Sequence, residues 1–306
     1  MYIANGVVSR CDSIVDYMPH SLRKYFYNID LSEAYEIHLY PMRPLAVCYP
    51  GKILFITIDG TLTDNPYRGI RISTSHIDEA MEIASRSSVY SVEEEIRNGY
   101  ITIEGGHRIG ICGSAVIKDG HIAFVKDISA LNYRLAREIK GAAQAVIDEV
   151  YNEGQVRNTL IISPPGAGKT TMLRDIVRSL SYDGIRVCVV DERREIAAMH
   201  SGRTDFDIGP SSTVFSGAPK AAGMLMMLRA MSPDVIVTDE IGTISDARAV
   251  ARTINSGTKI ITSIHGYSYE QVCRRRDLDM ALPFFELFIT LSKSERVGMV
   301  KEKVFA

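Results

Sequence analysis

Residues 159–181 read TLIISPPGAGKTTMLRDIVRSLS, and this stretch decides the fold of the second half of the chain. An apolar strand leads into a turn rich in proline and glycine, and an amphipathic helix follows. Gly168-Lys169-Thr170 supplies the last three positions of the phosphate-binding pattern G-x-x-x-x-G-K-[ST]. In this context the backbone N–H groups of the loop and of the helix start favour a phosphate anion. The stretch therefore predicts a nucleotide site in an α/β domain.

The pattern has a glycine at position 163, where this chain carries Ser163. Serine is small and can make the turn if its backbone angles stay in an allowed region. We expect Lys169 to bridge the terminal phosphates of ATP and the hydroxyl of Thr170 to ligate Mg²⁺. The predicted nucleotide-binding residues are Ser163, Pro164, Pro165, Gly166, Ala167, Gly168, Lys169, Thr170 and Thr171.

Short apolar strands follow this stretch and alternate with helical segments. They read RVCVVDE (186–192), DVIVTDE (234–240), KIITSIH (259–265) and LFITLSK (287–293). Strands that are apolar throughout, each following a helix, predict a mainly parallel sheet covered on both faces. A further helix is expected at about 139–153, ahead of the phosphate loop. We therefore assign residues 139–306 to an α/β domain.

Acidic and histidine side chains stand where these strands end. Asp239-Glu240 has the form of a Walker B element, in which Asp239 holds Mg²⁺ and Glu240 polarises the attacking water. Asp191 and Glu192 follow another strand, with Glu195 close behind. His265 ends a third. Ligands of open α/β sheets bind outside the carboxyl ends of the strands, so these groups are expected to converge on the γ-phosphate.

Residues 1–138 have a different pattern. The stretches EIHLYPMRPLAVCYP (36–50) and GKILFITID (51–59) predict strands bounded by Pro and Gly, and residues 74–98 predict a helix with a capping-type start. YITIEGGHRIGICGSAVI (100–117) predicts a strand, a Gly-Gly turn and a second strand. The first part of the chain therefore predicts an α+β domain.

Composition limits the partners and the cellular compartment that we expect for the protein. The net charge of −2 gives no overall basic field for nucleic acid. The five cysteines are scattered and form no C-x-x-C pair, which favours free thiols in a reducing cytosol over zinc or disulfides. No signal peptide and no apolar run of roughly 18–20 residues is found. We expect a cytoplasmic protein, with attachment to a membrane through a partner left open.

Together these residues resemble the secretion ATPase superfamily, the motors of type II and type IV secretion and of type IV pili. Its members carry a phosphate loop, an acidic Asp box, a Walker B strand and a His box in that order. Here the four lie at 163–170, 191–195, 234–240 and 262–266. The resemblance implies a RecA-like P-loop ATPase domain after the N-terminal domain, with ATP and Mg²⁺ bound.

A closer resemblance is to the stage III sporulation protein AA family. It is carried by ITIEGGHRIGICGSAVI (101–117), NYRLAREIKGAA (132–143), PPGAGKTTMLRDIVR (164–178), VVDERREIA (189–197) and MLRAMSPDVIVTDEIG (227–242). The family implies a cytoplasmic ATPase of the mother cell in endospore-forming bacteria. Such a protein would power or help to assemble a secretion or feeding channel between mother cell and forespore.

The resemblance also implies roles for individual residues. The activating acid of the Asp box would be Glu192 or Glu195, which we leave open because the superfamily commonly has Glu-Asp where this chain has Asp191-Glu192. His265 would sense the γ-phosphate. The superfamily forms hexameric rings, with nucleotide between the two domains and arginines completing the site. Candidates for the arginine are Arg108, Arg134, Arg137 and Arg203.

Three functions remain in view. The first is a homo-oligomeric ATPase that couples hydrolysis to motion of the N-terminal domain against membrane-embedded channel components. The second is an ATP-binding scaffold with little turnover that nucleates channel assembly, which Ser163 and the altered Asp box would fit. The third, a nucleic-acid motor, is disfavoured, because the charge run RRRD (274–277) is short and the chain has no broad basic surface.

Overall fold

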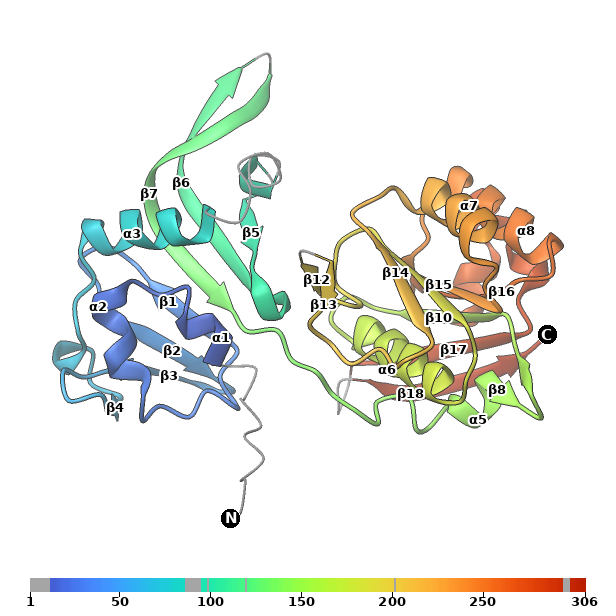
Figure 1. The fold of residues 1–306 in the computed structure, drawn as a ribbon, viewed down its shortest axis with the longest axis horizontal. Coiled ribbons are helices and arrows are strands. Elements are labelled where there is room, and N and C mark those ends of the chain that lie inside the picture. Colours follow the sequence, from blue (N-terminus) through green and yellow to red (C-terminus); the bar gives the residue numbers. More distant parts are fainter. Residues whose placement is uncertain (1–11, 86–94, 98, 119, 201, 294–297) are drawn as a thin grey trace. The chain divides into compact units, whose positions relative to one another are not determined.

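The structure is a computed structural model that describes residues 12–85, 95–97, 99–118, 120–200, 202–293 and 298–306 (Figure 1). The chain divides into two compact units, Met1–Arg137 and Glu138–Ala306. In the described part of the chain, no helix combines the length and the apolar character that crossing a bilayer requires.

The first unit is built on an antiparallel sheet with the strand order β4-β3-β2-β1-β7-β6-β5. Its strands are β1 (Glu36–Leu39), β2 (Ala46–Tyr49), β3 (Lys52–Ile56), β4 (Leu62–Thr63), β5 (Tyr100–Thr102), β6 (Arg108–Lys118) and β7 (His121–Arg134). Its helices are α1 (Asp12–Val15), α2 (His20–Arg23) and α3 (Thr74–Ser85), with single turns at η1 (Lys24–Phe26), η2 (Pro66–Arg68) and η3 (Glu104–Gly106).

The core of this unit is built by side chains that alternate between the two faces of each strand. In β1, Ile37 and Leu39 are fully buried on the face that the helices cover, whereas Glu36 and His38 lie on the other face. The predicted helix start is confirmed, because the hydroxyl of Ser73 accepts a hydrogen bond from the N–H of His76 at 3.3 Å. The predicted helix over 74–98 is described as far as α3, and residues 86–94 and 98 lie outside the described part.

The second unit contains the sheet β14-β11-β15-β16-β10-β17-β18, parallel except for the antiparallel pairing of β18 with β17. The strands of this sheet are β10 (Thr159–Ser163), β11 (Val187–Asp191), β14 (Ser212–Ser216), β15 (Val235–Glu240), β16 (Lys259–His265), β17 (Leu287–Ser292) and β18 (Met299–Phe305). Two short hairpins are formed by β8 (Tyr151–Asn152) with β9 (Gln155–Val156) and by β12 (Met199–His200) with β13 (Arg203–Thr204).

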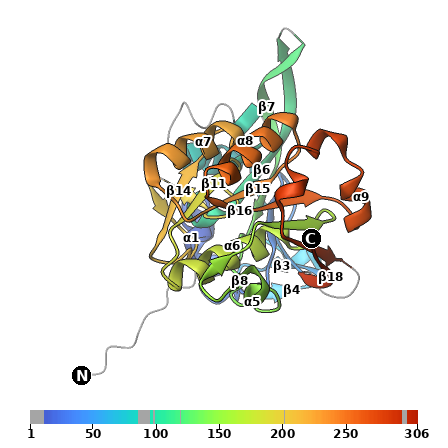
Figure 2. The same ribbon diagram turned by 90° about the vertical axis from the view of Figure 1, so that its right-hand side faces the viewer.

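Helices cover both faces of this sheet (Figure 2). They are α5 (Ile147–Val150), α6 (Lys169–Tyr182), α7 (Lys220–Met231), α8 (Ile244–Asn255) and α9 (Tyr269–Cys273), with turns η4 (Arg276–Leu278) and η5 (Leu282–Phe284). Within β10, Ile161 packs in the cluster that includes α6, and Leu160 and Ile162 pack in the cluster that includes α7 and α8. The predicted mainly parallel α/β sheet is confirmed, and β14 and β18 extend it beyond the strands that the sequence pattern indicated.

One predicted element is wrong. A helix was expected at about 139–153, but α5 is four residues long and β8 begins directly after it. Glu153 (φ 50°) and Gly154 (φ 80°) are both left-handed and join β8 to β9. Two consecutive left-handed residues are typical of a tight hairpin turn and cannot continue a helix. The hairpin therefore ends the helix at Val150, and ahead of α5 residues 140–146 form turns in which Gly141 is left-handed (φ 82°).

Candidate functional site

The phosphate loop connects β10 to α6 and is shaped by two left-handed glycines. Gly166 has φ 71°, and Gly168 has φ 91° immediately before Lys169, the first residue of α6. A side chain at either position would be strained whatever space it had. The first N–H groups of α6 have no partner within the helix, so they are available to phosphate oxygens. Thr170 and Thr171 lie half-buried in this first turn.

Ser163 fits where the general pattern has glycine because the backbone there is ordinary strand. It is the last residue of β10, it pairs with His265 of β16, and it is absent from the described residues with positive φ. Its buried hydroxyl donates to the carbonyl of Pro164 at 2.8 Å. Position 163 therefore does not require the conformational freedom of glycine.

Lys169 meets the Walker B strand directly. Its Nζ atom lies 2.6 Å from Oε2 of Glu240, the last residue of β15. Burial acts to raise the pKa of Glu240, but the hydrogen bond and charge of Lys169 outweigh it and lower that pKa overall. The charge of His265 also lowers the pKa of Glu240, so the end of β16 contributes to the same site. The structure thus brings together three of the predicted groups.

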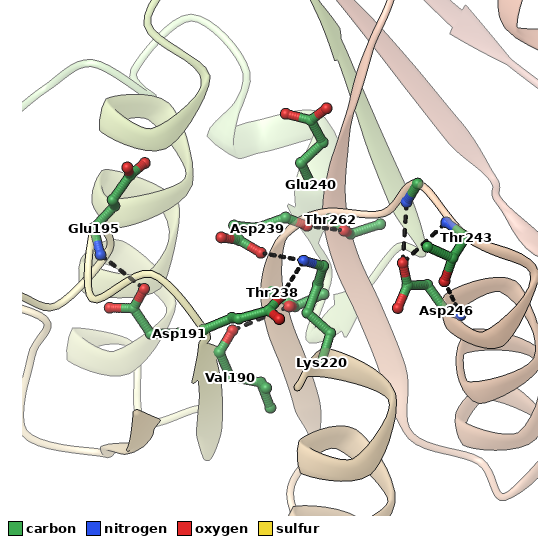
Figure 3. Close-up of polar contacts among 12 residues, drawn as sticks. Val190, Asp191, Glu195, Lys220, Thr238, Asp239, Glu240, Thr243, Asp246 and Thr262 are labelled. Carbon is green, nitrogen blue, oxygen red and sulfur yellow. Dashed lines mark hydrogen bonds and ion pairs between the residues drawn. The ribbon is translucent and has the colours of Figure 1, made fainter. Parts of the chain in front are cut away.

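Asp239 lies beside Glu240 but is almost fully enclosed. It is 4% exposed, and its Oδ1 atom makes no hydrogen bond to any residue that the structure describes. Burial raises the pKa of Asp239 to about 6, against the opposing charge of Lys220. Its position is fixed by neighbouring strands, since Thr262 donates to the carbonyl of Asp239 at 2.7 Å and Thr238 to that of Val190 at 3.0 Å (Figure 3).

The Asp box divides into a structural acid and two more accessible ones. The fully buried carboxylate of Asp191 accepts hydrogen bonds from the backbone N–H groups of Glu195, Ile196 and Ala197, at 2.9, 3.1 and 2.9 Å. It therefore shapes the turn after β11. The side chain of Glu195 points away from Asp191 (Figure 3), and Arg174 of α6 donates to the Glu195 carbonyl at 2.6 Å. This turn is thereby tied to the helix of the phosphate loop.

Lys220 is a member of the site that sequence reasoning missed. It begins α7, and its ammonium forms a short ion pair with Glu192. The ammonium also lies 3.4 Å from Oδ1 of Asp239 (Figure 3). The side chain is only 10% exposed. Nothing in the local pattern marked it, because it stands after a loop at the start of an ordinary apolar helix.

The phosphate loop borders a surface cavity of about 820 Å³. Tyr267 lines it and packs edge-to-face on His265 with 5.7 Å between ring centroids. The other lining residues are Pro164, Pro165, Leu291, Ser292, Lys293 and Lys301. A mostly apolar hollow with two cations beside a phosphate loop has the size and chemistry of a small-ligand site.

Two of the candidate arginines are neighbours in the first unit. Arg108 of β6 pairs in register with Arg134 of β7, which in turn pairs with Glu36 of β1. The guanidinium of Arg108 lies over the ring of Tyr100, 4.7 Å from its centroid. Arg134 is exposed, with its Nε atom 4.0 Å from Oε1 of Glu36. Their roles in a nucleotide site stay predictions.

The other two candidates have different surroundings. Arg137 donates from Nη2 to the carbonyl of Ala34 at 2.7 Å, so part of its guanidinium holds the first unit together. Arg203 is exposed on the β12–β13 hairpin of the second unit. Neither observation assigns a catalytic role.

The donor set fits Mg²⁺. The hydroxyl of Thr170 and the carboxylate of Asp239 are both oxygen ligands, and one or two protein oxygens are usual for a Mg²⁺ that also binds phosphates. The buried Oδ1 of Asp239 has no hydrogen bond among the described residues, so a cation could satisfy it if the Lys220 ammonium, 3.4 Å away, moved off. A second cluster, Glu36, His38 and Cys48, is less suited, because the sulfur lies 3.5 and 3.8 Å from the two ring nitrogens of His38, beside the ring rather than along either lone pair.

The sequence profile of the family described as Sporulation stage III, protein AA matches residues 9–304. Over 302 residues the chain is 32% identical to the stage III sporulation protein AA of Bacillus subtilis (strain 168), which covers 95% of this chain and 94% of that protein.

Two solved structures share the fold. The ATPase DotB of Legionella pneumophila matches with a TM-score of 0.56 at 17% identity, over 84% of this chain and 72% of DotB. The pilus retraction motor PilT with bound ADP matches with a TM-score of 0.57 at 16% identity, over 84% of this chain and 74% of PilT. These likenesses confirm the predicted RecA-like P-loop fold with a preceding α+β domain. With the family profile spanning nearly the whole chain, the protein belongs to the sporulation stage III protein AA family.

Proposed function

We propose that the protein is a Mg²⁺-dependent ATPase of the secretion-ATPase type that serves sporulation. The observation that carries the proposal is the meeting of Lys169 with Glu240 at 2.6 Å, at the carboxyl ends of parallel strands and at the start of a phosphate-loop helix. This arrangement joins the phosphate-binding lysine to the acid that would polarise water. Asp239, Lys220 and Glu192 extend the same charged cluster.

Each residue has a distinct task in this proposal. Lys169 leaves Glu240 and binds the terminal phosphates of ATP, which frees the Glu240 carboxylate to accept a hydrogen bond from water. Asp239 and Thr170 would hold Mg²⁺, which neutralises charge on the β- and γ-phosphates. His265, close enough to act electrostatically on Glu240, is placed to respond to the γ-phosphate. The base and ribose have room in the cavity lined by Tyr267.

The proposal extends to assembly. The solved relatives in fold include a secretion-type ATPase and a pilus retraction motor, and by that analogy we propose a homo-oligomeric ring, hexameric as in the superfamily. An arginine of the set Arg108, Arg134, Arg137 and Arg203 would complete each nucleotide site. The ring would act on membrane-embedded components of a channel between mother cell and forespore. Light scattering with and without a non-hydrolysable ATP analogue tests this, and a monomer under all conditions would refute the ring.

Phosphate release at steady state tests the ATPase itself. We expect Glu240→Gln to lower the rate by about 100-fold or more, as is usual for loss of an acid or base group, with nucleotide binding retained. Asp234→Asn is the matched control, because Asp234 precedes the same strand at its opposite end, where it pairs with Arg186. This variant should release phosphate close to the wild-type rate.

Equal rates of phosphate release for wild type and Glu240→Gln would contradict the proposed ATPase activity and favour an ATP-binding scaffold. The ion pair of Lys169 with Glu240 gives that second function some support, since it occupies the phosphate-binding lysine before nucleotide arrives. Loss of ADP binding in Lys169→Ala distinguishes a scaffold that binds nucleotide from a protein that binds none.

A further inference from the structure

The ammonium of Lys220 lies between two carboxylates that come from different strands. It contacts Oε2 of Glu192, which follows β11. It also lies 3.4 Å from Oδ1 of Asp239 in β15, the contact that Figure 3 shows. One side chain thus connects two strand ends to the first residue of α7. Since the side chain is 10% exposed, bulk water screens these contacts weakly.

The backbone position is unfavourable for a cation, because the start of a helix carries partial positive charge. The loop before Lys220 is nevertheless held in place, with the N–H of Gly217 donating to the carbonyl of Asp191 at 3.0 Å. The carboxylates of Glu192 and Asp239 both approach the ammonium, so the charge of this enclosed lysine is compensated from two strands.

The carboxylate of Asp239 that the ammonium approaches is the one proposed to hold Mg²⁺, and its Oδ1 has no hydrogen bond among the described residues. A divalent cation bound to that oxygen and an ammonium 3.4 Å from it would repel each other strongly in a poorly solvated site. The two cations therefore exclude one another at Asp239. Glu192 still offers the ammonium a partner when it leaves Asp239.

We propose that Lys220 is a positioning residue that controls the access of divalent cations to Asp239. In the nucleotide-free protein its ammonium neutralises Asp239 and Glu192 together, and it withdraws to Glu192 when Mg²⁺ enters with ATP. The inference rests on the proposed function, because it takes Asp239 as a ligand of Mg²⁺. Its consequence is a site that rejects free cations and accepts them with the triphosphate.

The test is calorimetric titration of MnCl₂ into nucleotide-free protein at pH 8. We expect Lys220→Met and Lys220→Gln to bind Mn²⁺ at least tenfold more tightly than wild type, since the competing charge is gone. Lys259→Met is the matched control, because Lys259 pairs with Glu286 at 2.8 Å at the opposite end of the parallel strands. It should keep the wild-type affinity. The gain in Lys220→Met should disappear when Asp239→Asn is added.

Mn²⁺ binding that is unchanged or weaker in a folded Lys220 variant would overturn the inference, as would tighter binding that survives Asp239→Asn. Circular dichroism checks the fold, and Lys220→Gln decides if Lys220→Met does not fold, because glutamine retains a hydrogen bond to Glu192. If neither folds, Lys220 is structural and the inference fails. ADP binding by the wild-type protein in EDTA is measured separately. A wild-type protein that binds no ADP would refute the nucleotide site, whereas the Mn²⁺ titrations alone decide the role of Lys220.

Discussion

Asp239 carries a carboxylate where a negative charge is poorly solvated, and replacing it should make the metal-free protein more stable. It is 4% exposed and Oδ1 makes no hydrogen bond among the described residues. Burial raises the pKa of Asp239 from 3.8 to about 6; the charge of Lys220 opposes this rise and that of Asp191 adds to it. The folded protein therefore binds the proton more tightly than the unfolded chain does.

The size and sign of the effect follow from this difference. Well below pH 3.8 both states are protonated and Asp239 costs no stability; the cost grows as pH rises between the two pKa values, 3.8 and about 6, and levels off above them. Asparagine resembles the protonated acid, so Asp239→Asn removes the cost. With a pKa raised from 3.8 to about 6, the gain is about 3 kcal/mol at pH 8 and roughly half of that at pH 5.

The assay is urea unfolding in EDTA at pH 5 and pH 8. Circular dichroism is the signal, because the chain contains no tryptophan. Asp234→Asn is a control for which the opposite change is expected. The hydrogen bond from Arg186 lowers the pKa of Asp234, so the protein should become slightly less stable when this exposed side chain is made neutral. A variant Asp239→Asn that is less stable than wild type at pH 8, or equally stabilised at both pH values, would refute the reasoning.

Two other changes test how the site is supported. Arg174→Met should lower the free energy of unfolding by about 3–5 kcal/mol, because Arg174 donates to two carbonyls of the turn after β11 and stacks 3.7 Å from the ring centroid of Phe206. Urea unfolding measures this loss, and a value under about 1 kcal/mol would contradict the reasoning. Gly209→Ala should cost more stability than Gly184→Ala, because both glycines have positive φ but a Cβ at 209 would lie 2.5 Å from Oγ of Ser181 and one at 184 would meet nothing within 4 Å. Equal melting temperatures for these two variants would show that the close contact relaxes without cost.

The chemistry of the second unit was largely readable from the sequence, because its signals are local. A run of apolar residues marks a buried strand, and the residue that ends it must stand at the sheet edge where ligands bind. Lys169, Glu240 and His265 could be placed near one another on that basis, and the structure brings them together. The strand β14 escaped notice because its residues are half-buried and its sequence, STVFS, is only partly apolar.

The remaining features depend on contacts between distant segments. Lys220 lies 28 residues from Glu192 along the chain. No rule of sequence spacing predicts that the first residue of α7 meets the residue after β11. Asp191 looked like one more candidate acid, yet its hydrogen bonds to three backbone N–H groups give it a structural task. The helix expected at 139–153 is wrong at both ends: residues 140–146 form turns, with Gly141 left-handed, and the left-handed Glu153 and Gly154 form a hairpin turn after α5.

The ion pairs at the strand ends also bear on how this site can change over evolutionary time. Lys169 is matched to Glu240, and Lys220 to Glu192 and Asp239. Removing either lysine leaves its buried or half-buried carboxylates without compensation, which is more damaging than losing the lysine together with its acids. Among relatives, substitutions at these five positions should therefore be correlated. A lineage that loses catalysis should lose an acid and its paired lysine together.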